Sequence, residues 1–258
     1  MDIFKIFDAY SLRARLFPAV IAAAPALASI ALFVSWKSFG LSNVIVSVAA
    51  AVLLFAIADF ARRRGKAVER REYPNGSGLP SITLFRRNDS TIDEATKQRY
   101  RSFLGKGLGV EAPSEDDEAR NQITADKFYE QCGVWLRHAT RDAKKFPILF
   151  NENATYGFRR NLLGLKWLAL ALNVLVVVFC AAVLSLDKWN WNTNLGKRTV
   201  VVLVIAIAHA TYMLFAVRWA VVAEAAVTYG RELILSCEAF TPRVIPSRTR
   251  SRSKKSQG

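Results

Sequence analysis

Four long apolar stretches limit what this chain can fold into more than any other feature of the sequence. They are Leu16–Trp36, Val44–Phe60, Trp167–Leu186 and Thr199–Val217. Asp59 and His209 are the only acidic, basic or histidine residues within them. Each stretch approaches the roughly 20 residues that cross a hydrocarbon core about 30 Å thick, and none has the polar stripe of a soluble core helix. The sequence therefore predicts an all-α integral membrane protein with four transmembrane helices, paired as two hairpins.

The first stretch has an alternative interpretation, a cleaved signal peptide. Its apolar run is longer than the usual 7–15 residues of a signal-peptide core. The segment that follows, "SWKSFGLSN" (Ser35–Asn43), has bulky residues where a cleavage site needs small ones. Pro18 and Pro25 fit a membrane helix, in which proline is better tolerated than in water. We therefore expect a retained membrane anchor.

The distribution of basic residues predicts the topology. The chain is 52% hydrophobic but carries a formal net charge of +15, and residues 61–165 hold 20 Lys and Arg against 14 Asp and Glu. The tail Thr241–Gly258 adds six basic residues and no acidic one, whereas Lys37–Asn43 and Asp187–Arg198 hold one and three. Because cytoplasmic loops are rich in Lys and Arg, we expect both termini and the central segment in the cytoplasm of a multi-pass bacterial inner-membrane protein.

This topology divides the chain into four segments. We expect an N-terminal transmembrane hairpin over residues 1–61, a small α-rich cytosolic insert over 62–165, a C-terminal transmembrane hairpin with a helical extension over 166–240, and a disordered basic tail over 241–258. Inside the insert the pattern predicts helices over Ile92–Leu104 and Ile123–Thr140. It also predicts a short strand or extended arm at Ser81–Phe85 and an acidic loop at Val110–Arg120. With few apolar side chains, the insert is expected to pack on itself, on a second copy or on the membrane surface.

A polar and aromatic segment, "FPILFNENATYGFRRN", joins the insert directly to the third apolar stretch. One interpretation is an anchoring belt of aromatic and arginine side chains that fixes helix depth. That interpretation leaves the Asn–Glu–Asn cluster unexplained. We therefore expect a rigid turn at Gly157 that couples movement of the insert to the third span or binds a ligand. The residues of this predicted coupling elbow are Asn151, Glu152, Asn153, Tyr156, Gly157, Phe158, Arg159 and Arg160.

Three side chains with a charge, an amide or an imidazole lie within the apolar stretches: Asp59, Asn173 and His209. Intramembrane ionisable groups are costly to bury, so each is a candidate functional residue. Asp59 adjoins "ARRR" and is a candidate for pairing with it. For Asn173 and His209 a hydrogen bond between helices is favoured over a pore or proton site.

Basic residues beside the second stretch and in the tail predict contacts with anionic lipid headgroups. The candidates are Arg62, Arg63, Arg64, Lys254 and Lys255. The pattern "SRTRSRSKKS" leaves RNA binding open, but tethering beside a membrane favours lipid over nucleic acid. Alanine-rich runs such as "AVIAAAPALASIA" allow close helix packing, so we also expect a homo-oligomer.

Catalytic and transport functions find little support in the sequence. His138 and His209 are the only histidines, and no metalloprotease, serine hydrolase or phosphate-loop motif occurs. Cys132, Cys180 and Cys237 do not have metal-ligand spacing. We therefore expect no enzyme activity, no metal and no cofactor. Transporters usually have more spans and internal symmetry, and the two predicted hairpins share no repeat.

The segment "TRDAKKFPILFNENATYGFRRNLLGLK" beside the third stretch, within this four-span plan, resembles the four-helix transmembrane effectors of bacterial antiphage defence. The resemblance is architectural and carries no site residues over. It implies an effector that permeabilises the inner membrane in response to a cytosolic protein or nucleotide signal. The alternative is a non-catalytic membrane scaffold or anchor for a cytosolic partner complex.

Overall fold

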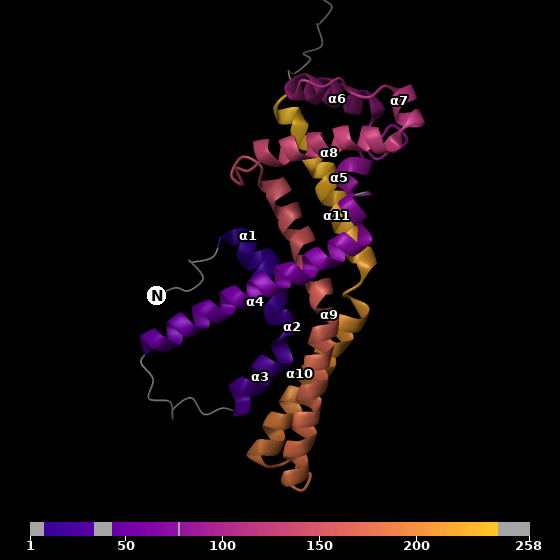
Figure 1. The fold of residues 1–258 in the computed structure, drawn as a ribbon. Coiled ribbons are helices and arrows are strands. Elements are labelled where there is room, and N and C mark those ends of the chain that lie inside the picture. Colours follow the sequence, from indigo (N-terminus) through magenta and orange to yellow (C-terminus); the bar gives the residue numbers. More distant parts are fainter. Residues whose placement is uncertain (1–7, 34–42, 77, 242–258) are drawn as a thin grey trace, which may run out of the picture.

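A computed structural model describes residues 8–33, 43–76 and 78–241, and every regular element within these ranges is helical, with no strand. Figure 1 shows an elongated molecule in which two long helices form one end and a cluster of shorter helices forms the other. The all-α prediction is therefore confirmed for the described residues. The predicted basic tail from residue 242, with Lys254 and Lys255, lies outside them.

The long helices α9 (Pro147–Leu186) and α10 (Asn194–Phe215) lie side by side as an antiparallel pair (Figure 1). Pro147 is the first residue of α9, where its lack of an N–H group costs no helical hydrogen bond. Thr193 caps α10, because its side chain accepts a hydrogen bond from the N–H of Gly196. Both helices are long and apolar enough to cross a membrane. We call Trp167–Leu186 of α9 together with α10 the apolar hairpin.

The N-terminal part of the chain is a bent series of short helices. α1 (Ala9–Ser11), a π-helical turn η2 (Leu12–Leu16) and α2 (Phe17–Ala22) lead to α3 (Ala24–Phe33). The helix axis turns by 63° at the break after Ala22. The segments before and after this break form a third possible span only if one membrane crossing contains the bend. Pro25 follows the break directly and, having no N–H, cannot continue the hydrogen-bond ladder there.

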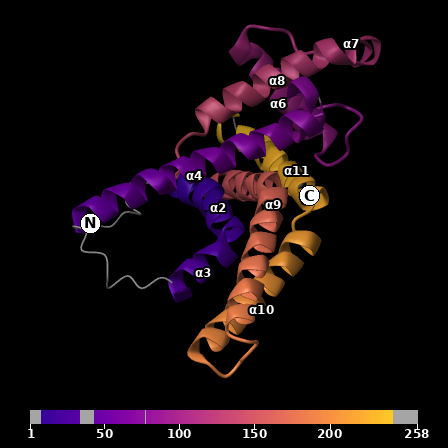
Figure 2. The same ribbon diagram turned by 60° about the horizontal axis from the view of Figure 1, so that its bottom comes forward.

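Helix α4 (Asn43–Glu72) is the element on which the prediction of two transmembrane hairpins is only partly confirmed. It runs across α9 instead of alongside it (Figures 1 and 2). It contains the predicted second stretch, Val44–Phe60, only part of whose side chains are among the described residues. Within the described part of the chain two helices are able to span a membrane, or three with the bent pair, and four spans are not shown. Beyond Phe60 α4 becomes densely charged, and it crosses α9 in that charged half.

The remaining helices form a compact group that we call the helical unit. It comprises α5 (Pro80–Thr83), α6 (Glu94–Leu108), α7 (Glu115–Arg120) and α8 (Gln122–Ala139), together with the end of α11 (Trp219–Leu235) and the 3₁₀ turn η5 (Ser236–Ala239). A second 3₁₀ turn, η4 (Pro74–Gly76), links α4 to it. The helix predicted over Ile123–Thr140 is confirmed as α8, and the helix predicted over Ile92–Leu104 is confirmed as α6.

Two local predictions in this unit were wrong. The strand or arm expected at Ser81–Phe85 is helical over Pro80–Thr83, because Pro80 occupies the first turn of a helix that buries Ile82. The acidic loop contains α7, whose N-cap Ser114 exchanges hydrogen bonds with Asp117 in a capping box. Both errors arose because short helices depend on their caps and burial more than on periodicity.

The core of the helical unit is completed by the C-terminal part of the chain. Phe85, Tyr129 and Leu136 are fully buried, and Leu233 and Ile234 of α11 lie in the same apolar cluster. The insert therefore does not bury its apolar side chains alone, as its composition suggested. The fold brings α11 back from the apolar hairpin to close the core.

Two fully buried cations fasten α6 to the turn after α5. Lys97 donates to the carbonyls of Arg86 and Asp89 at 2.6 Å each, and Arg101 donates to the carbonyl of Phe85 at 2.8 Å. Both cations also pair with Glu94. Buried charges are tolerated when they are paired and hydrogen-bonded in this way. The contacts hold α6 against the turn after α5.

Candidate functional site

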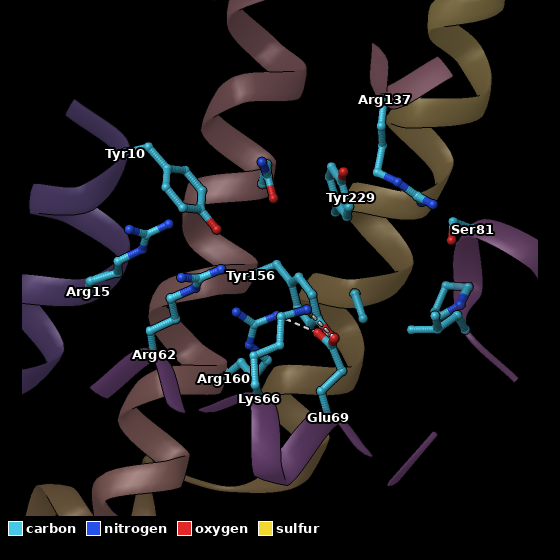
Figure 3. Close-up of a pocket in the computed structure, with 14 residues that line it drawn as sticks. Tyr10, Arg15, Arg62, Lys66, Glu69, Ser81, Arg137, Tyr156, Arg160 and Tyr229 are labelled. Atoms are coloured by element: carbon cyan, nitrogen blue, oxygen red, sulfur yellow. Dashed lines mark hydrogen bonds and ion pairs between the residues drawn. The ribbon is translucent and has the colours of Figure 1, made fainter. Parts of the chain in front are cut away.

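A concentration of polar groups lies where α9 leaves the helical unit and meets α1, α4 and α11. A cavity of about 410 Å³ opens there, which we call the junction pocket (Figure 3). Its polar and aromatic lining comes from seven elements and includes Tyr10, Arg15, Arg62, Lys66, Glu69, Ser81, Arg137, Asn153, Tyr156, Arg160 and Tyr229. An adjoining cavity of about 280 Å³ shares Tyr10, Arg137, Asn153 and Tyr229 with it and adds Arg141.

The N-terminal segment reaches the pocket because α9 has a glycine at the contact. A Cβ added at Gly157 would lie 2.9 Å from both the Tyr10 hydroxyl and the Ala14 Cβ. The approach is fixed by Asn161, whose side chain donates to the carbonyl of Ala14 at 2.6 Å. Glycine is therefore required at position 157 for close packing and not for an unusual backbone conformation, since the backbone there is helical.

Helix α4 is held against α9 by a second close contact. A Cβ added at Gly164 would lie 2.6 Å from the carbonyl carbon of Arg64, so the two backbones touch at their crossing. Arg64 also donates from Nε to the carbonyl of Gly164 at 3.3 Å. This crossing places the next turns of α4, with Lys66 and Glu69, over the pocket face of α9.

Glu69 is the centre of the charge network in the pocket. Its carboxylate pairs with Arg160 and Lys66 and accepts a hydrogen bond of 2.8 Å from the Tyr156 hydroxyl. Burial favours the protonated carboxyl, but the charges of Arg160 and Lys66 and the hydrogen bonds outweigh it, so the pKa of Glu69 lies below its ordinary value of 4.5. Glu69 is therefore a carboxylate at neutral pH.

Aromatic rings organise the walls of the pocket. Tyr156 and Tyr229 stack with ring centroids 6.1 Å apart and planes inclined by 8°. The Arg160 guanidinium lies over the Tyr156 ring at 5.2 Å, and that of Arg15 lies over Tyr10 at 5.5 Å. Such cation–π contacts restrict where the guanidinium groups point without neutralising their charge. The arginines are thus oriented and still able to meet an anion.

The predicted coupling elbow is not a turn. All eight of its residues belong to the uninterrupted helix α9, because Pro147 starts this helix and Gly157 does not interrupt it. Asn153, Tyr156 and Arg160 share the pocket face. Arg159 points to α11 instead, donating to the carbonyl of Val221 at 3.1 Å and lying 3.6 Å from Glu224.

The other residues of the predicted elbow do not line the junction pocket. Asn151 accepts a hydrogen bond of 2.6 Å from Arg13, and Phe158 packs in the cluster formed by α2, α9 and α10. Glu152 is half-buried and does not line the junction pocket. The rigid set of Asn151, Glu152 and Asn153 near both arginines is therefore not observed, since a helix sends successive side chains about 100° apart.

The three intramembrane candidates and the basic run make ordinary pairwise contacts. Asp59 pairs with Arg63 at 2.7 Å across one helical turn. Asn173 donates to the carbonyl of Ala206 at 2.9 Å and lies 2.9 Å from Nδ1 of His209, which ties α9 to α10. Of the candidate lipid-binding arginines, Arg62 lines the junction pocket, while Arg63 and Arg64 do not.

Several pocket residues escaped the sequence analysis. Tyr10, Arg15, Glu69, Arg137 and Tyr229 come from distant parts of the chain and carry no shared motif. The one available signal is Glu69 in "GKAVERRE", the first carboxylate after a run of cations that begins at Arg62. Among the described residues no group of three or more His, Cys, Asp or Glu side chains is arranged to hold a metal ion.

Comparison with known proteins gives no relative on which to model this site. No protein-family model, no curated protein and no solved structure matches the chain.

Proposed function

We propose that the protein is a membrane-embedded effector that permeabilises the bacterial inner membrane when a cytosolic signal or partner acts on the junction pocket and the helical unit. Bacterial defence is the setting that the architectural resemblance favours. Two apolar helices long enough to span a membrane support the membrane part of the proposal. The helical unit and the pocket then lie on the cytoplasmic side, where the basic residues are concentrated.

The observation that carries the proposal is the continuity of α9. Near its start Leu149 lies in the core of the helical unit, and farther along Tyr156 and Arg160 line the junction pocket. Its second half, with Val176 and Cys180, packs against α10. A continuous helix is a stiff element, so a shift of its first half is passed to its second half without a loop to absorb it.

The full topology belongs to this proposal as well. In it the chain crosses the membrane four times, both termini are cytoplasmic, and α4 must turn from its position across α9 to enter the bilayer. The low charge of Leu16–Trp36 and Val44–Phe60 supports these crossings. A reporter fused after Ser38 or Asn192 is then expected to report the outer side, and one near Asp116 the cytoplasm. A reporter near Asp116 on the outer side would overturn the topology.

Membrane potential distinguishes the effector from its competitor, a non-catalytic scaffold. Overproduction in a bacterial host raises the amount of assembled protein, so the effector is expected to depolarise the membrane and slow growth, as read by a potential-sensitive dye. A scaffold leaves the potential unchanged while it still binds partners. An unchanged potential at normal abundance would therefore reject the effector function.

A matched pair of insertions tests the role of α9. Two glycines inserted between Lys166 and Trp167 soften the helix and rotate the apolar half by about 200°. The same insertion after Asn192, in the connection between α9 and α10, leaves both helices intact. At equal abundance in the membrane fraction, only the first insertion is expected to abolish depolarisation. Depolarisation by both variants would show that α9 does not transmit the signal.

A further inference from the structure

The junction pocket holds more positive charge than its own residues can balance. Five cationic side chains line it: Arg15, Arg62, Lys66, Arg137 and Arg160. Glu69 is its single carboxylate. Figure 3 shows the charged ends of Arg15, Arg62, Lys66 and Arg160 gathered between Tyr10 and Glu69. Like charges held this close repel one another, and the repulsion is relieved when an anion enters.

These cations are not simply a solvated face of one helix. They come from η2, α4, α8 and α9, and Arg160 is buried, with only 6% of its surface exposed. Arg15 and Arg160 are oriented by stacking on Tyr10 and Tyr156. Groups brought from four elements to one cavity and fixed in direction form a binding site with little left to reorganise.

We infer that the junction pocket binds a ligand carrying at least two phosphate charges, either a soluble phosphorylated metabolite or the phosphate headgroup of a membrane lipid. Guanidinium groups suit this chemistry because their planar forks bind phosphate oxygens in pairs. A volume of about 410 Å³ lies within the ordinary range for small-molecule sites and exceeds what one phosphate needs. Asn153 and Ser81 add hydrogen-bonding groups at the rim.

The position of the pocket along the chain explains why both sources of phosphate are considered. Arg15 directly precedes the first apolar stretch, Arg62 follows the second after one residue, and Arg160 lies about two turns before the third. A pocket at this level faces the water and the headgroup layer together. The binding inference therefore does not rest on the effector function, because a site for phosphate at this level is equally compatible with a scaffold.

Glu69 already contacts the cations and the hydroxyl that a phosphate would use. It occupies Arg160 and Lys66 and holds the Tyr156 hydroxyl. An incoming phosphate must compete with this carboxylate for the same cations. Glu69→Gln keeps the shape and the hydrogen bond to Tyr156 but removes the competing charge, so it is expected to tighten phosphate binding about tenfold.

The test uses the full-length protein in phosphatidylcholine nanodiscs and two neighbouring arginines of α4. Arg62→Ala removes a cation that lines the pocket, and Arg63→Ala removes another exposed cation, which pairs with Asp59 outside it. Pyrophosphate binding, measured by calorimetry, is expected to be saturable, to weaken about tenfold in Arg62→Ala and to be unchanged in Arg63→Ala. A second arm replaces part of the phosphatidylcholine with phosphatidic acid and measures retained lipid by native mass spectrometry.

The two arms identify the source of the phosphate. Binding of pyrophosphate that depends on Arg62 supports a soluble ligand, whereas retention of phosphatidic acid that depends on Arg62 supports a lipid headgroup. In either arm Glu69→Gln is expected to bind more tightly than the wild type. The inference is overturned if neither probe binds saturably, or if Arg62→Ala and Arg63→Ala weaken binding equally, which would indicate a diffuse surface charge. Membrane potential is not part of this test, so its failure and that of the effector function are separable.

Discussion

In the helical unit many large apolar side chains form a buried core, whereas in the apolar hairpin many of them lie outside. Phe85 and Leu136 of the helical unit are fully buried. In the hairpin, Ile207 is 66% exposed and Phe215 is 70% exposed, while the polar Asn173 is buried between the helices. The same hydrophobic effect produces both arrangements if the hairpin is surrounded by lipid, because apolar side chains gain little by leaving an apolar solvent.

The largest expected effect comes from removing one aromatic side chain in the helical unit and comparing it with the same change in the apolar hairpin. Phe85→Ala removes a fully buried ring that stacks on Tyr129, so it is expected to lower the free energy of unfolding of the helical unit by about 3–5 kcal/mol. Phe215→Ala removes a ring already exposed to the surroundings of the hairpin and is expected to cost less than about 1 kcal/mol. Denaturant titration of both variants in nanodiscs measures the difference. Equal costs would contradict the contrast between the two regions.

A smaller effect is expected where the two regions meet, at the arginines of α9. Arg160 is buried and paired with Glu69, so Arg160→Lys loses the planar fork and is expected to cost about 1.5–3 kcal/mol. Arg159 is half-buried and contacts Glu224 and the Val221 carbonyl near the surface. Arg159→Lys is therefore expected to cost less than about 1 kcal/mol. Denaturant titration of both variants measures the two losses of unfolding free energy. A larger loss for Arg159→Lys than for Arg160→Lys would show that the pocket face of α9 is wrongly assigned.

Gly157 tests whether the N-terminal segment is fastened to α9. In Gly157→Ala the new Cβ collides with Tyr10 and Ala14, and relieving this collision is expected to cost about 1–3 kcal/mol. The control is Gly107→Ala on α6, where an added Cβ meets nothing within 4 Å and alanine is the better helix former. Gly107→Ala is expected to stabilise by about 0.5–1 kcal/mol. A neutral Gly157→Ala would mean that the segment does not pack here.

The smallest effect expected is a dependence on acid. The pKa of Glu69 is lower in the folded protein than its ordinary value of 4.5, so its ion pairs stabilise the fold fully above that pH. This stabilisation is lost as the pH falls below 4.5 through the lowered pKa. Glu69→Gln is therefore expected to flatten the acid side of the stability profile, measured by thermal unfolding across pH. A profile unchanged by Glu69→Gln would show that the charge of Glu69 does not stabilise the fold.

The sequence predicted the elements that depend on local chemistry. The two spans of the apolar hairpin follow from uninterrupted apolar residues, and α8 follows from its amphipathic period. The tertiary approach of the N-terminal segment to α9 has no local signal. Asn161 and Ala14 are 147 residues apart, and their contact depends on glycine at a position where sequence alone suggests a turn.

The candidate site was predicted on α9 and, at Arg62, on α4. Tyr156 and Arg160 stand out in the sequence because aromatic and arginine residues cluster before an apolar run. Glu69 and Arg137 do not, because surface-like charges are common on amphipathic helices and their convergence requires the crossing of α4 over α9. The direction of α4 was itself missed, since an apolar half-helix resembles a span until its packing is known.

Cysteine labelling along α9 tests the central contrast most directly. Ile148, near the start of α9, and Leu175, in its apolar half, are each 65% exposed, so the protein itself shields them equally. The native Cys132, Cys180 and Cys237 are buried and give little background. In intact nanodiscs a water-soluble maleimide is expected to react with Ile148→Cys and not with Leu175→Cys, and detergent denaturation is expected to make both react. Equal labelling of the two variants in nanodiscs would contradict a membrane-embedded hairpin.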